Sequence, residues 1–160
     1  MTNRLRAHGL AVTVPTGWDG AITRTLGALP GEPGGPGDGG TAHPVVHVAT
    51  FALPRVRGDY GGGAVESMRP DDVFITLVEF DPEAGDTPLF VDEGVQPLMP
   101  AGFRRETMHR MIPGQAGHQQ FFHTNGRAFC LYVAIGSHAQ RARLARAAAS
   151  VVSTLRIDPL

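Results

Sequence analysis

The dipeptide Asn125-Gly126 stands between two apolar runs, and it constrains this chain more than any other local feature. It follows Phe121 and Phe122, and it precedes the run AFCLYVAI. Asn-Gly readily takes the positive φ values of a type I′ turn, which joins two antiparallel strands through two residues. We therefore predict a hairpin that pairs Phe122 with Phe129 and Phe121 with Cys130, and hence an antiparallel sheet.

An amphipathic helix is predicted after the hairpin. Ser137-x-x-Gln140 is a capping-box pattern, in which the two side chains satisfy free amides at a helix start. At about 100° per residue, the apolar residues of the following segment fall on one stripe. They are Leu144, Ala148, Val151, Val152 and Leu155. Asp158-Pro159 ends the pattern, so we expect about four turns of helix covering one face of the sheet.

Four further apolar runs indicate strands. They are 10–14, 21–25, 44–53 and 72–81, and the second is expected to pair back against the first. We also expect an edge strand at 103–112 and a short helix at 58–68. The segment 27–42 has seven glycines and three prolines, which predict a flexible loop. We expect one α+β domain over residues 1–160: an antiparallel sheet of about six strands, a long C-terminal helix packed on one face, and a short helix elsewhere.

Composition limits the classes of partner. Fourteen basic and fifteen acidic residues leave a formal net charge of -1, so the broad positive field that attracts nucleic acid is missing. All the basic residues are arginine, which excludes lysine chemistry such as a Schiff base or a P-loop. The first residues carry no apolar signal region, no run reaches membrane-spanning length, and Cys130 is a single cysteine. We expect a cytoplasmic protein without membrane insertion.

No metal or cofactor is expected. His43 and His47 lie in an extended segment, where positions i and i+4 are roughly 13 Å apart and cannot share one metal. His118 and His123 differ by an odd number, so they point to opposite faces of one strand. Cys130 lies between apolar neighbours, as is typical of a buried thiol that behaves as a small hydrophobic side chain.

Two groups of residues are candidates for binding. Ser137, His138 and Arg141 lie at the expected helix start, where free backbone amides favour an anion. Arg104, Arg105 and Arg110 lie on the expected edge strand, where they either protect the edge or recognise an acidic partner. A serine nucleophile at Ser137 is a further alternative, although Ile135 stands where a nucleophile elbow needs glycine.

The order of these segments resembles the PsbP-like domain family, which includes actinobacterial members. The resemblance rests on the opening strand with Pro15-Thr16-Gly17-Trp18, the late hairpin and the final helix with VVSTLRI. It implies helices around an antiparallel sheet, used mostly for docking to partners and not for catalysis. The loop at 27–42 and the long stretch before Phe103 depart from a compact form of that fold.

The leading functional hypothesis is a non-catalytic binding or accessory module that docks to a protein partner through its sheet edge or loops. The alternative is a small-ligand-binding domain with its ligand between helix and sheet and an anion site at the helix start. A serine hydrolase is the third hypothesis.

Overall fold

Eight β-strands and one α-helix make up the regular structure of residues 2–24 and 43–160, the part of the chain that the computed structural model describes. The strands are β1 (Asn3–Ala7), β2 (Leu10–Val14), β3 (Asp19–Arg24), β4 (Pro44–Ala49), β5 (Val73–Phe80), β6 (Ala116–Thr124), β7 (Arg127–Ile135) and β8 (Arg156–Ile157). The helix α1 spans Arg141–Val152. The flexible loop predicted at 27–42 lies outside the described residues.

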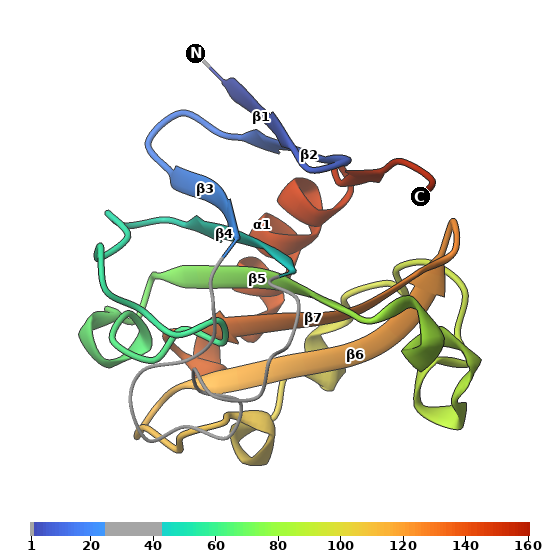
Figure 1. Ribbon diagram of the computed structural model, residues 1–160. Coiled ribbons are helices and arrows are strands. Elements are labelled where there is room, and N and C mark those ends of the chain that lie inside the picture. The colour runs from blue at the N-terminus through green and yellow to red at the C-terminus, as the bar shows by residue number, and fades with distance from the viewer. Residues whose placement is uncertain (1, 25–42) are drawn as a thin grey trace.

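The strands form two antiparallel sheets (Figure 1). The larger sheet has the order β3-β4-β5-β7-β6, and the smaller has the order β1-β2-β8. The smaller sheet therefore joins the two ends of the described chain, because β8 pairs with β2. No helix among residues 2–24 and 43–160 is long and apolar enough to cross a membrane.

The predicted fold class is wrong. In place of one sheet of about six strands with a long and a short helix, the described residues hold two sheets, of three and five strands, and one α-helix of 12 residues. The short helix expected at 58–68 is a single 3-10 turn at Val65–Ser67. Sequence reasoning overlooked β1 and β8 because NRLRA is mostly polar and β8 has only two residues. It also paired 21–25 with the wrong strand, since β3 pairs with β4.

The predicted hairpin is confirmed. Phe122 pairs with Phe129 and Phe121 with Cys130 across β6 and β7. The turn residues Asn125 and Gly126 have φ values of 52° and 76°. Both lie in the left-handed region that the Asn-Gly dipeptide favours.

One edge of the larger sheet is β6, the other is β3, and the expected edge strand at 103–112 does not form. The chain touches β6 at one bridge, between Arg104 and Gly117, and then makes a 3-10 turn at Arg105–Thr107. Met108 leaves the sheet edge because it is buried against Tyr132, whose hydroxyl lies 3.5 Å from its sulfur. This single bridge fixes the backbone of Arg104, and Arg105 follows it directly.

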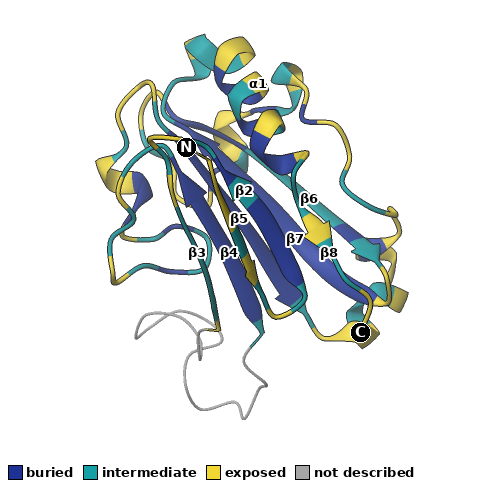
Figure 2. Ribbon diagram, turned by 90° about the horizontal axis from the view of Figure 1, so that it is seen from above, coloured by how far each residue is buried: buried dark blue, intermediate teal, exposed yellow. Residues whose placement is uncertain are grey.

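The core lies on both faces of the larger sheet, and the central strands β4, β5 and β7 are buried along their length (Figure 2). Most of the expected apolar stripe covers one face: Leu144, Ala148, Val151 and Val152 are buried there with Leu131 and Val133 of β7. The helix ends at Val152, before the end predicted at Asp158-Pro159, so Leu155 follows it and is half-buried. A second cluster around Phe74 and Tyr132 fills the other face. Helix α1 thus has one end near the Arg104 bridge and the other beside β8.

Candidate functional site

Four of the six predicted site residues meet in one hollow at the start of α1. Arg104, Arg105, His138 and Arg141 line a cavity of about 410 Å³ together with Ala101, Phe103 and Glu106. We call this cavity the arginine hollow. Sequence reasoning placed its residues in two separate sites, one on a strand edge and one at a helix start.

Backbone bonds hold the two sides of the hollow in place. The amide of Arg104 donates to the carbonyl of Gly117 and the amide of Gly117 donates to the carbonyl of Arg104, both at 2.9 Å. Next to Arg104, Phe103 is buried and anchors the segment in the core. On the opposite side, the amide of His138 donates to the carbonyl of Gly114 at 2.7 Å. The arginine side chains therefore project from a fixed backbone.

The hollow carries an excess of positive charge. The guanidinium groups of Arg104 and Arg105 have no hydrogen-bond or ion-pair partner within the described ranges. Arg141 donates from Nη1 to the carbonyl of His138 at 3.0 Å and makes no ion pair there. Against these three cations stands one carboxylate, Glu106. A guanidinium forms two parallel hydrogen bonds to a carboxylate or a phosphate, so the arrangement suits an anionic group.

The helix start adds to this charge. The first turn of α1 contains no acidic residue, although the positive end of a helix dipole favours one. Arg143, also near this end, is paired with Asp71 at 2.7 Å and is therefore compensated. Arg141 has no such partner among the described residues, so an anion bound here would remove an unfavourable interaction.

Ser137 and Arg110 do not join the hollow. Arg110 reaches Glu66 at 3.4 Å, and the Ser137 hydroxyl makes no capping hydrogen bond. The capping-box prediction is wrong because the amide of Gln140 is taken by the carbonyl oxygen of Ser137, at 3.1 Å, in a 3-10 turn that precedes α1. Glu106 and Phe103, which sequence reasoning missed as lining residues, are neighbours of arginines that it had singled out.

The residues considered for metal or thiol chemistry are engaged in structural contacts. No group of three or more metal-binding side chains comes together in the described part of the chain. His43 bonds to Asp81 at 2.7 Å, and His47 is buried. Cys130 is buried as expected, and burial raises the pKa of its thiol to about 12. A thiol with such a pKa is protonated at neutral pH and is a poor nucleophile.

A larger cavity lies at the other end of α1. Its volume is about 600 Å³, and apolar side chains of α1, of β6 and of the loop 94–98 form most of its wall. Sequence reasoning expected a ligand between the helix and the sheet but placed its site at the helix start. We call this second cavity the apolar cleft.

No protein-family model, curated protein or solved structure matches this chain.

Proposed function

We propose that this chain is a non-catalytic binding module that docks an acidic segment of a protein partner at the arginine hollow. The observation that carries the proposal is the convergence of Arg104, Arg105 and Arg141 on one cavity without a matching set of carboxylates. Arg104 and Arg105 are exposed and Arg141 is half-buried, so an incoming carboxylate can reach each guanidinium and bind it through two parallel hydrogen bonds.

The size and isolation of the charge favour an acidic peptide over nucleic acid. A cavity of about 410 Å³ holds one or two side chains. The formal net charge of the chain is -1, so the positive potential is local and does not form the long stripe that follows a phosphate backbone. The PsbP-like resemblance implies the same kind of use and stays a prediction.

A binding role needs no catalytic group, and the side chains of the hollow form no catalytic arrangement among the described residues. Arginine keeps its proton throughout the physiological range, so the three arginines cannot act as general bases. His138 also lines the hollow, but its ring makes no hydrogen bond to a hydroxyl or thiol among the described residues. The Ser137 hydroxyl has no histidine partner among the described residues. The proposal includes a cytoplasmic setting, which suits the free thiol of Cys130.

The test is a titration of the protein with a fluorescently labelled hepta-glutamate peptide, followed by anisotropy, with hepta-glutamine as the matched neutral peptide. We expect the double variant Arg104→Gln/Arg105→Gln to weaken hepta-glutamate binding by about fivefold, because two ion pairs between exposed groups contribute roughly 0.5 kcal/mol each. Arg110→Gln is the control, since Arg110 faces Glu66 outside the hollow.

Two results would reject the proposal. One is equal binding of hepta-glutamate by wild type and by the double variant. The other is tighter binding of a single-stranded oligonucleotide than of hepta-glutamate at the same ionic strength, which would assign the hollow to nucleic acid.

A further inference from the structure

The apolar cleft is enclosed by parts of the chain that are far apart in sequence. Phe122 of β6 and Val152 of α1 are buried, and Ala149, Leu155 and Ile157 contribute half-buried apolar surface. Val95 lines the cleft from the loop 94–98. A cavity of about 600 Å³ with such walls has the size and polarity of sites that hold small organic molecules.

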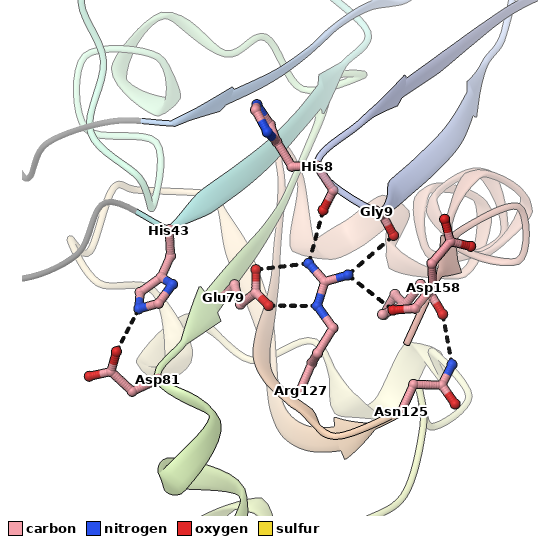
Figure 3. Close-up of polar contacts among 9 residues, drawn as sticks. His8, Gly9, His43, Glu79, Asp81, Asn125, Arg127 and Asp158 are labelled. Carbon is pink, nitrogen blue, oxygen red and sulfur yellow. Dashed lines mark hydrogen bonds and ion pairs between the residues drawn. The ribbon is translucent and has the colours of Figure 1, made fainter. Parts of the chain in front are cut away.

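Hydrogen bonds at the edge of the cleft hold its walls in place. Gln96 and Gln120 form a reciprocal pair: the amide of Gln96 donates to Gln120 Oε1 at 2.7 Å, and Gln120 Nε2 donates to the carbonyl of Gln96 at 3.1 Å. At the hairpin tip, Asn125 Nδ2 donates to the carbonyl of Ile157 at 2.7 Å (Figure 3). The loop, the hairpin and β8 are thus tied together, so the cleft exists before any ligand enters.

These hydrogen bonds also determine which class of ligand fits the cleft, because they leave few polar groups free to bind one. The backbone of Gln96 and the side-chain amide of Gln120 already satisfy one another, the side-chain Nε2 of Gln96 donates to carbonyls of its own loop, and Asn125 is bound to β8. A polypeptide segment would bring backbone donors and acceptors to an apolar wall that offers few free partners, and burying them unpaired is costly. A hydrocarbon or aromatic body has no such groups.

One charge lies at the rim of the cleft. Arg156 is the single charged residue among those described that line it. Its Nη1 donates to the carbonyls of Ser153 and Leu155, at 3.0 and 2.7 Å, which fixes the side chain. Nη2 and Nε make no other hydrogen bond in the described ranges and remain as donors. An apolar wall with one fixed guanidinium at its edge is complementary to a small molecule with an apolar body and one anionic head.

We propose that the apolar cleft binds a small amphipathic monocarboxylic acid, with its apolar body against Val95, Ala149 and Leu155 and its carboxylate on Arg156. This site is independent of the arginine hollow, since it lies at the opposite end of α1 and shares no lining residue with it. A chain with both sites would bind an acidic segment at one end and a small organic acid at the other.

The experiment is a calorimetric titration of the full chain with decanoate and, as the matched neutral ligand, 1-decanol, each below the concentration at which it aggregates. We expect saturable binding of decanoate and about fivefold weaker binding of decanol, because an ion pair with the exposed Arg156 contributes up to about 1 kcal/mol. In Arg156→Gln the two ligands should bind alike. Ala149→Phe, which fills the cleft from α1, should abolish binding of both.

Val95→Trp fills the same space from the opposite wall, so it tests the proposal even if Ala149→Phe fails to fold. Arg104→Gln/Arg105→Gln should leave decanoate binding unchanged. The proposal is overturned if decanoate does not bind saturably, if both cavity-filling variants bind it as wild type does, or if the variant of the arginine hollow loses it. The last result would place the carboxylate in the hollow and would leave the docking proposal standing.

Discussion

Arg127 Nε donates to Glu79 Oε1 at 2.6 Å in an ion pair whose two side chains are only 5% and 7% exposed. Nη2 donates to the other oxygen of Glu79 at 3.0 Å, so the pair has two parallel bonds (Figure 3). The remaining donors of Arg127 reach the carbonyls of His8, Gly9 and Asp158. One guanidinium therefore ties β5 and β7 to the β1-β2 turn and to the residues after β8.

Replacing Arg127 by Met should lower the free energy of unfolding by about 3–5 kcal/mol, because it leaves the Glu79 carboxylate buried without a partner. Urea denaturation measures the change. Arg6→Gln is the control: it breaks the exposed Arg6–Asp158 pair and should cost at most about 1 kcal/mol. The double variant Glu79→Met/Arg127→Met should recover only part of the loss, since three carbonyls still lack their donor. Equal losses for Arg127→Met and Arg6→Gln would contradict this account.

Gly126→Val should destabilise the chain by about 1–2 kcal/mol, the cost of placing a residue with a Cβ at a positive φ. The φ of Gly126 is 76°, and an added Cβ there would meet no atom within 4 Å. The loss would therefore come from backbone conformation and not from a clash. Gly126→Asn is the matched variant and should lose clearly less, because asparagine tolerates this region better. Similar thermal melting of the two variants would argue against the interpretation.

The features that were predicted correctly from the sequence depend on residues that lie close together along the chain. The Asn125-Gly126 hairpin has its turn, its register and its apolar runs within twenty consecutive residues, and the stripe of α1 lies within one helix. β8 could not be predicted in this way, because two residues carry no periodicity and their pairing comes from β2 at the other end of the chain. The partners of Arg127 likewise come from three separate segments.

In the candidate sites, too, local features were predictable from the sequence and long-range contacts were not. Arg104, Arg105, His138 and Arg141 could be named from charge and position alone. Their meeting in one hollow depends on the bridge between Arg104 and Gly117, which local patterns do not contain. A ligand between helix and sheet was an alternative hypothesis, but the location and lining of the apolar cleft were not predicted, because its walls are ordinary apolar residues of elements that only the tertiary structure brings together.

Ser137→Ala should change the free energy of unfolding by less than about 0.5 kcal/mol, as for an ordinary surface substitution. An intact capping box would make the loss about 1 kcal/mol, but the Ser137 hydroxyl makes no capping bond. Wild-type protein should also resist a fluorophosphonate probe, since no histidine activates this hydroxyl within the described residues. Stoichiometric labelling that disappears in Ser137→Ala would revive the hydrolase hypothesis.

Lowering the pH should destabilise the chain through His47, which is 1% exposed in the larger sheet. Its Nδ1 accepts from Arg57 Nε at 2.8 Å and its Nε2 donates to the carbonyl of Asp59 at 2.9 Å, so the network requires the neutral ring. Burial lowers the pKa of His47 from 6.5 to about 4. Between these two values the unfolded chain binds a proton that the folded chain does not, so stability is complete above pH 6.5 and falls as the pH drops toward 4.

The size of this loss is on the order of 3 kcal/mol, since each pKa unit corresponds to about 1.4 kcal/mol. Urea denaturation at pH 7, 5.5 and 4.5 measures it in wild type and in His47→Gln, which has no titrating ring. Burial also lowers the pKa of His118, so the variant should keep a smaller fall in the same direction. An unchanged pH dependence in His47→Gln would show that other groups cause the acid sensitivity.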